Sequence, residues 1–131
     1  MKKANTPTSR RSHLGRVRGL GSAGHGVHHW WVQRLTAMAL IPLTIWFSVS
    51  LALLSNASHG EMIAWLQMPQ NLIGVFLVVV VAFYHSYLGL QVVIEDYVAD
   101  QGRKLASLIC TQFAMVLFAL IAMYNLLKIG F

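Results

Sequence analysis

One histidine stands in the middle of a long apolar stretch of this chain. His85 lies about nine residues from the end of an uncharged run that extends from Met62 to Ile94. If that run is a membrane-spanning helix, a rise of about 1.5 Å per residue places the imidazole ~14 Å below the helix end, well inside the hydrocarbon. A titratable ring at that depth is costly and usually serves a function. The chemistry open to it is metal ligation, with haem iron foremost, or proton transfer.

His85 shares one side of that helix with other residues of chemical interest. Gly89 is four positions later on the same face, where a missing side chain would let a flat ring system approach the backbone. Ordinary packing of small residues explains Gly89 equally well. Asp96 is eleven positions after His85, and eleven steps of about 100° return to within ~20° of the starting direction. The stripe thus reaches the helix end, where Tyr97 follows, although such residues are equally typical of a solvated helix terminus.

A second point of interest is Arg34, with His28 and His29 just before it. An interfacial arginine can hold a carboxylate or a phosphate through two parallel hydrogen bonds. The competing interpretation is a plain positive anchor at the membrane surface. Because Arg34 precedes another apolar run, it would lie on the same side of the membrane as Asp96 and Tyr97.

Composition indicates the elements that carry these residues. Of 131 residues, 56% are hydrophobic and only 11% are charged, too few to cover a soluble domain of this size. Three runs without Asp, Glu, Lys or Arg each exceed the roughly 20 residues that cross a bilayer: Leu35 to Gly60, Met62 to Ile94 and Leu105 to Leu127. Backbone groups in lipid must be satisfied within the segment, and the runs do not alternate as barrel strands do. We therefore expect an all-α membrane protein with three transmembrane helices, over about 32–55, 71–94 and 105–127.

The sequence divides into two parts. Residues 1–27 read as a basic, flexible arm, in which several glycines disfavour helix. Residues 28–131 form the three-helix transmembrane domain. Within it, Pro42 is expected to bend the first span, and residues 56–70 are expected to form a short polar loop.

The positions of Lys and Arg predict the orientation in the membrane. The N-terminal side has seven, the last of them Arg34 at the start of the first span, whereas the first loop has none, the second loop has two and the tail has one. The N-terminus and the second loop should therefore be cytoplasmic and the C-terminus on the opposite side. The net charge of +6 fits contact with anionic membrane lipid, and no nucleic acid partner is expected. Glycine and proline in the arm disfavour a mitochondrial transit helix, so we expect a bacterial inner membrane protein.

The number of deep histidines constrains any haem-binding interpretation. A six-coordinate haem with two histidine ligands needs two imidazoles, and only His85 lies deep in a span. The other histidines lie outside the spans or at their edges: His13, His25, His28, His29 and His59. Three helices also enclose a cofactor poorly. The second ligand would come from another chain, which predicts a membrane partner.

Two stretches of the sequence resemble those of a known family. The stretch HSYLGLQVVIEDY, from His85 to Tyr97, resembles the signature of the small hydrophobic membrane anchor of succinate dehydrogenase, the cytochrome b-type anchor of respiratory complex II. That signature has a His, a Gly four residues later, a Gln two further on and an Asp-Tyr at the end of the second helix. The stretch GVHHWWVQRLTA, from Gly26 to Ala37, is similar to the start of that family's first helix. The resemblance covers residues 26–128 through the three-helix layout.

The resemblance implies a subunit of succinate:ubiquinone oxidoreductase that catalyses nothing alone. His85 would be an axial ligand of the iron of haem b, which is shared with the larger cytochrome b anchor subunit. Arg34 and His28 would lie near the haem propionates, with the spacing to Arg34 favouring His28 over its neighbour. Tyr97, with Asp96 beside it, would reach the ubiquinone site and hydrogen-bond a quinone carbonyl oxygen. The other partners would be the iron–sulfur and flavoprotein subunits.

Other functions stay open at this point. A fumarate reductase-type anchor without haem, or an unrelated cytochrome b, would differ in haem content. A small transport or scaffold subunit in which His85 relays protons would carry no visible cofactor. The larger anchor subunit of the same complex is disfavoured, because the chain lacks a Ser-x-x-His-Arg-x-Thr-Gly start to its first helix.

Overall fold

The structure is a computed structural model that describes residues 23–130, with side chains from residue 27 onward. This range contains helices and no strand: α2 (Ala23–Leu53), α3 (His59–Gln67), α4 (Pro69–Tyr97) and α5 (Gln101–Gly130). Helices α2, α4 and α5 are each long and apolar enough to cross a membrane. The predicted all-α fold with three spanning helices is confirmed.

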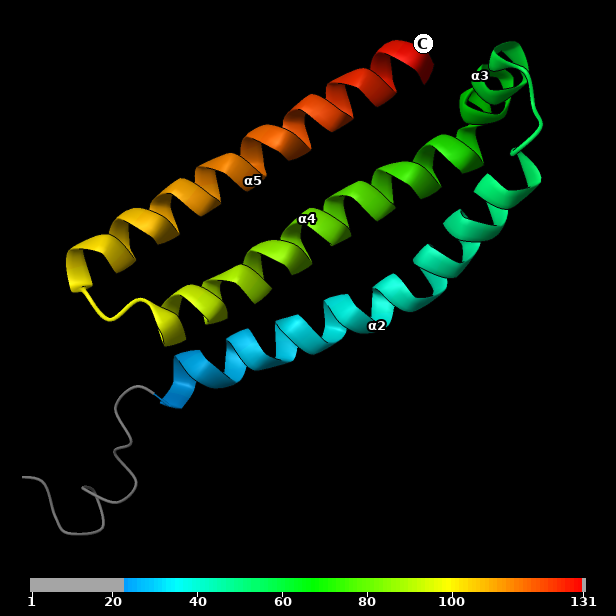
Figure 1. Cartoon of the computed structure of the whole chain (residues 1–131). Helices are drawn as coiled ribbons and strands as arrows, with labels where there is room; N and C mark the ends of the chain where they lie inside the picture. The colour runs from blue at the N-terminus through cyan, green and yellow to red at the C-terminus, as the bar shows by residue number, and fades with distance from the viewer. Residues whose placement is uncertain (1–22, 131) are drawn as a thin grey trace, which may run out of the picture.

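Helix α4 is the central helix of a single layer. It packs against both α2 and α5, whereas the backbones of α2 and α5 do not approach each other within residues 23–130 (Figure 1). The start of α2, the end of α4 and the start of α5 share one end of the layer, and α3 lies at the other end with the last turn of α5. The described chain therefore starts and finishes at opposite ends, as three crossings require. Which end is cytoplasmic stays a prediction.

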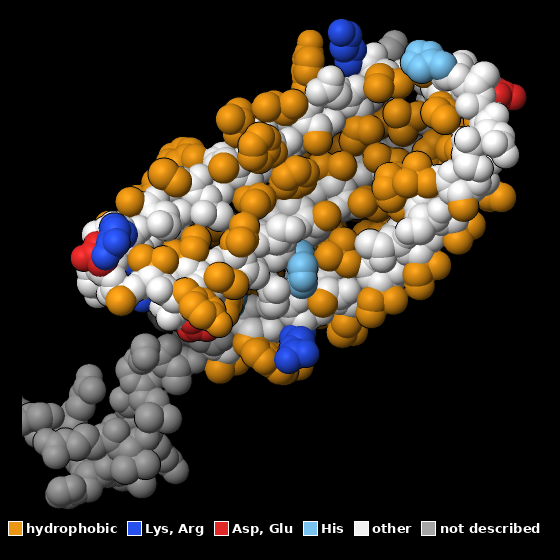
Figure 2. All heavy atoms as spheres, viewed as in Figure 1, with side chains coloured by type: hydrophobic (Ala, Val, Ile, Leu, Met, Phe, Trp, Pro, Cys, Tyr) orange, Lys and Arg blue, Asp and Glu red, His pale blue; other side chains and the backbone are white. Residues whose placement is uncertain are grey.

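Very little of the apolar surface is covered by the chain itself. Val75 and Leu88, exposed by 9% and 5%, are the buried large hydrophobic residues of the described range, and many others are half or more exposed. Figure 2 shows apolar side chains along the layer, with most acidic and basic side chains gathered toward its ends. An apolar surface of this extent must be covered by lipid or by partner helices.

The first helix starts earlier than the sequence predicts. We expected a non-helical arm up to residue 27, but α2 begins at Ala23 and includes Gly24 and Gly26. Each helical glycine costs about 1 kcal/mol, yet extension of a formed helix gains one backbone hydrogen bond per residue fixed. The rest of the predicted arm lies outside the described residues. Helix α2 continues through Pro42 and curves along its length (Figure 1), in agreement with the expected bend.

The loop expected at residues 56–70 contains the short helix α3. Its first turn is closed by a capping box: the backbone N–H and the hydroxyl of Ser58 each donate to Glu61 Oε2 at 2.7 Å, and Ser58 Oγ accepts from the Glu61 N–H at 3.4 Å. At its other end, Gln67 Nε2 donates to the carbonyl of Ile129 at 3.1 Å. Helix α3 is thereby fixed against α4 and α5 at one end of the layer.

This capping box has a testable pH dependence. The pKa of Glu61 is lowered from its ordinary 4.5, first by the backbone N–H of Ser58 and then by the Ser58 hydroxyl. Because the folded-state pKa is depressed, the stabilisation is present above the unfolded pKa and is lost as pH falls through the folded value. We expect the Glu61 carboxyl carbon, followed by NMR, to titrate below 4.5. In Ser58→Ala the midpoint should rise only part of the way, since the backbone N–H remains. A wild-type midpoint at or above 4.5 would contradict the capping box.

Gly74 allows α2 and α4 to approach closely. A Cβ at this position would meet three ring atoms of Trp46 inside normal contact distance. That ring cannot yield freely, because it stacks on Trp65 of α3 with ring centroids 6.0 Å apart. We expect Gly74→Ala to destabilise the α2–α4 packing by about 1–3 kcal/mol, measured as a lower melting temperature of the purified complex. Gly60→Ala is the control, since a Cβ there meets nothing within 4 Å; equal melting temperatures would argue against this contact.

Candidate functional site

His85 lies on the side of α4 that faces α2. Its Nδ1 is 2.9 Å from Thr36 Oγ1, and the Thr36 hydroxyl donates to the carbonyls of Val32 at 2.9 Å and Gln33 at 3.0 Å. When the one hydroxyl proton is donated to the backbone of α2, as both carbonyl distances allow, Oγ1 accepts a hydrogen bond from Nδ1–H. In this arrangement of the hydrogen bonds the imidazole proton is on Nδ1, and Nε2 keeps a free lone pair.

A cavity of about 500 Å³ opens beside His85 between α2 and α4. The lining residues are His29, Trp30, Gln33, Arg34, Ala37, His85 and Val92. Two polar atoms are buried here without a partner among the described residues, His29 Nε2 and Gln33 Oε1. A buried, unsatisfied polar atom costs about 1–3 kcal/mol. The cavity therefore offers hydrogen-bonding capacity that a polar or charged ligand group could satisfy.

The structure brings Arg34 and His85 together but separates His28 from them. Arg34 lines the cavity, and its guanidinium carbon lies 5.2 Å from the centroid of the Trp30 ring. His28 is exposed and lies outside the lining, whereas the neighbouring His29 is part of it. The arrangement favours His29 for a place in the cavity, against the sequence preference for His28. The role of either histidine toward a propionate stays a prediction.

Gly89 also faces α2. A Cβ there would lie 3.6 Å from Gln33 Nε2, which is an ordinary contact distance. Packing against α2 would therefore tolerate an alanine, so contact between these two helices does not by itself explain a glycine at this position.

Asp96 and Tyr97 lie at the end of α4, apart from the cavity. Both are exposed, Tyr97 by 84%. At about 1.5 Å per residue, the eleven positions from His85 to Asp96 span ~16 Å along the helix. The last turn of α4 is tied to α5 by Lys104, whose Nζ donates to the carbonyl of Glu95 at 2.8 Å and so satisfies one of the carbonyls that a helix end leaves free.

A metal held by protein ligands alone does not match this site. Across the described side chains, no three His, Cys, Asp or Glu residues lie together in a group that could hold a metal ion. Haem would need fewer protein ligands, because the porphyrin itself supplies most of the ligands of its iron and His85 could supply one more. A histidine with a free Nε2, an arginine beside it and two unmatched buried polar atoms fit such a group.

Sequence reasoning did not single out Thr36 or Gln33. The signal that could have found them is a polar stripe on the first helix: His29, Gln33 and Thr36 follow one another at spacings of four and three residues, hence on one face. In an otherwise apolar span, such a stripe predicts the face that meets the polar residue of a neighbouring helix.

Comparison with known proteins identifies the family of this chain. The family model described as Succinate dehydrogenase/Fumarate reductase transmembrane subunit matches residues 5–121. A succinate dehydrogenase hydrophobic membrane anchor subunit of Rickettsia bellii is 34% identical over 108 residues, which cover 82% of this chain and 86% of that protein. The protein of the same name from Paracoccus denitrificans is 31% identical over 112 residues, 86% of each chain. No solved structure shows a significant match.

The family match covers most of the chain, and the relatives are bacterial membrane proteins of similar length. Together with three apolar helices, it confirms the predicted resemblance and places the chain in the inner membrane as a multi-pass protein. The chain belongs to the succinate dehydrogenase/fumarate reductase transmembrane subunit family, as a membrane-anchor subunit of succinate dehydrogenase.

Proposed function

We propose that this chain supplies one axial ligand to a haem b and part of the ubiquinone site of succinate:ubiquinone oxidoreductase. An anchor subunit implies that flavoprotein and iron–sulfur subunits belong to the same complex and that membrane lipid surrounds the anchor. The observation that carries the haem proposal is the position and hydrogen bonding of His85 within the spanning helix α4. Its Nδ1 is engaged by Thr36, and it lines a cavity that also contains Arg34.

The second axial ligand would come from the larger cytochrome b anchor subunit. Helix α4 is flanked by α2 and α5 in a single layer, so the described chain cannot surround a planar macrocycle. In α4 and α5, His85 is the one histidine, and those of α2 stand near its start. A second imidazole would therefore be contributed by another chain.

Each residue of the cavity has a distinct part in this proposal. Haem bound there supplies a one-electron carrier within the membrane. His85 would offer its Nε2 lone pair to the iron, and Arg34 would balance the charge of a propionate through paired hydrogen bonds. The unmatched Nε2 of His29 supports a polar contact from this histidine, with His28 as the alternative that the sequence favours.

The quinone part of the proposal rests on the end of α4. The exposed phenol of Tyr97 can donate a hydrogen bond to a ubiquinone carbonyl oxygen, with Asp96 beside it. Such a bond strengthens as electrons arrive and negative charge grows on that oxygen. Lys104 holds the last turn of α4 in place, and the other walls of the site belong to partner subunits.

The test is to purify the complex through a tag on this chain in mild detergent and record a dithionite-reduced minus oxidised spectrum. We expect a b-type haem signal together with the flavoprotein, iron–sulfur and larger anchor subunits. A complex with its partners intact and no haem signal would overturn the haem proposal and favour a haem-free anchor of the fumarate reductase type. Membership of the family removes the support for a small transport or scaffold subunit with a proton-relaying His85.

A further inference from the structure

We propose that Thr36 is a positioning residue for His85, which fixes the orientation and tautomer of the imidazole and thereby sets the electron affinity of the haem. This inference rests on the haem ligation by His85 proposed above. Thr36 belongs to α2 and His85 to α4, so the contact also links the rotation of one spanning helix to the ligand carried by the other.

The geometry around Thr36 leaves its hydroxyl little freedom. The side chain is half buried, and Oγ1 lies 2.9 Å from the Val32 carbonyl and 3.0 Å from the Gln33 carbonyl of its own helix. A β-branched side chain has few rotamers in a helix. The Oγ1 lone pair is therefore held in one direction, toward His85 Nδ1 at 2.9 Å.

The hydrogen bond between Thr36 and His85 also differs from the other contacts between α2 and α4. Over the described residues it is the one side-chain hydrogen bond that joins α2 to α4. His29, Gln33 and Arg34 also lie between these two helices, but among the described residues none of their side chains makes a hydrogen bond to α4. A polar pair that joins two spanning helices at the proposed haem ligand favours a role in positioning that ligand.

The chemical consequence has a definite sign. When Nδ1–H donates a hydrogen bond, the imidazole becomes more basic and gives more electron density through Nε2 to a bound metal. Greater donation stabilises ferric over ferrous iron, so the bond to Thr36 lowers the midpoint potential of the haem. Removal of the bond should raise the midpoint potential and loosen the ring.

Helix α2 contains a matched control residue. The Thr44 hydroxyl donates to the carbonyls of Leu40 at 2.6 Å and Ile41 at 3.2 Å, as Thr36 does four and three residues back. Thr44 is exposed and makes no side-chain contact with a histidine in the described range. Thr44→Val therefore removes the same local hydrogen bonds from the same helix without changing His85.

The experiment uses the complete complex purified from its own membranes, with Thr36→Val, Thr36→Ser and Thr44→Val. Haem content, midpoint potential and the low-temperature EPR spectrum of ferric haem are measured. We expect Thr36→Val to bind haem ~10–100-fold more weakly, to show an altered low-spin spectrum and to have a higher midpoint potential. A tenfold change in the preference for ferric iron corresponds to about 59 mV for one electron. Thr36→Ser should restore the wild-type values, and Thr44→Val should leave them unchanged.

The outcomes separate this inference from the function on which it rests. If Thr36→Val keeps the wild-type potential and spectrum while His85→Ala loses low-spin haem, the role of Thr36 is overturned and the haem ligation stands. If the intact wild-type complex holds no haem, the proposed function fails and this inference fails with it. Thr36→Ala is measured in parallel, because it adds no bulk and must show the same rise in potential even if the valine variant does not assemble.

Discussion

Replacement of His85 by alanine is expected to remove the low-spin b-type haem from the complex. The ring would lose the Nε2 ligand on one face, so iron would be left five-coordinate or the haem would dissociate. We expect haem content to fall by about one to two orders of magnitude, since loss of even an indirect contact to a ligand costs ~10–100-fold. The reduced minus oxidised spectrum of the purified complex measures this directly.

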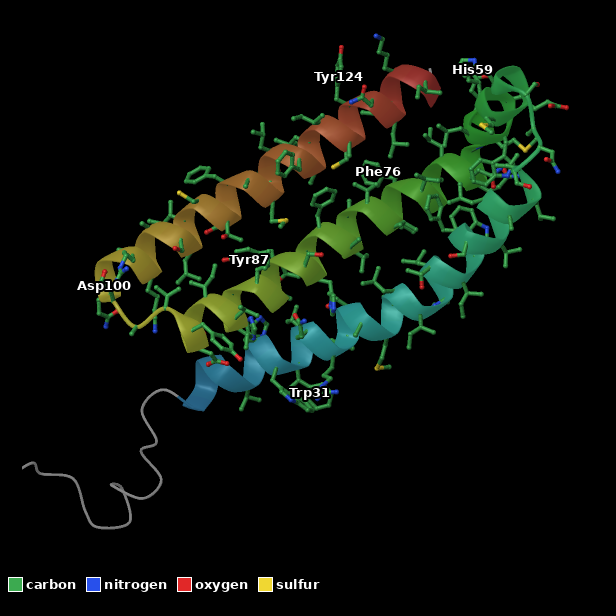
Figure 3. All side chains as sticks on the ribbon, viewed as in Figure 1. Trp31, His59, Phe76, Tyr87, Asp100 and Tyr124 are labelled. Atoms are coloured by element: carbon green, nitrogen blue, oxygen red, sulfur yellow. The ribbon has the colours of Figure 1, made fainter. Side chains whose placement is uncertain are left out.

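His59→Ala is the control for the first prediction. His59 is exposed and begins α3 at the far end of the layer (Figure 3), away from the cavity beside His85. This variant should keep the wild-type spectrum. A His85→Ala complex with all its partners and an unchanged low-spin haem would show that another residue ligates the iron.

Replacement of Tyr97 by phenylalanine is expected to slow quinone reduction by ~10–100-fold. In the proposed quinone site the phenol donates to an oxygen that becomes charged, and such bonds contribute about 1.5–3 kcal/mol, which corresponds to that range of rates. Succinate oxidation measured with a soluble dye should not change, because the role proposed for Tyr97 concerns only the later transfer of electrons to quinone. The ratio of the quinone-linked to the dye-linked activity is therefore the quantity to measure.

Tyr124→Phe serves as the matched control for the second prediction. Tyr124 is exposed on α5 near the end of the layer that carries α3, whereas Asp100, just beyond α4, marks the opposite end (Figure 3). Its loss should leave both activities at the wild-type level. If Tyr97→Phe reduced quinone as fast as Tyr124→Phe, the phenol of Tyr97 would have no part in the quinone site.

The spanning helices could be predicted because a segment that crosses lipid needs a long run of apolar, uncharged residues. The charge-free runs indicated three helices, and the structure has them as α2, α4 and α5. The ends of these helices were less predictable. At the start of α2, from Ala23 onward, only the low helix propensity of glycine opposes the helix, and this opposition is small. Helix α3 was missed because a short polar segment between spans resembles a loop, although Ser58 and Glu61 have the spacing of a capping box.

The sequence predicted the site residues that differ in type from their apolar surroundings. It did not predict those whose place depends on how two helices are oriented relative to each other. His85 and Arg34 stand out from their apolar surroundings, and both line the cavity. The sequence does not state how α2 is rotated about its axis relative to α4. That rotation decides that Thr36 meets His85 and that His29 faces the cavity in place of His28.

The quinone site depends on a different kind of information. Asp96 and Tyr97 were both predicted to lie at the end of the second helix, and α4 ends at Tyr97. Their exposure reflects a surface that partner subunits would cover. Neither the sequence of one chain nor its fold defines the walls of a pocket that several chains build, so these two roles stay predictions.

The EPR spectrum of ferric haem in a His85→Gly complex, recorded without and with added imidazole, tests the ligation most directly. Without imidazole we predict a high-spin signal, because one axial ligand is missing. Added imidazole should enter the cavity of about 500 Å³ beside residue 85 and restore a low-spin signal. A low-spin signal in the glycine variant without imidazole would contradict the assignment of His85 as a haem ligand.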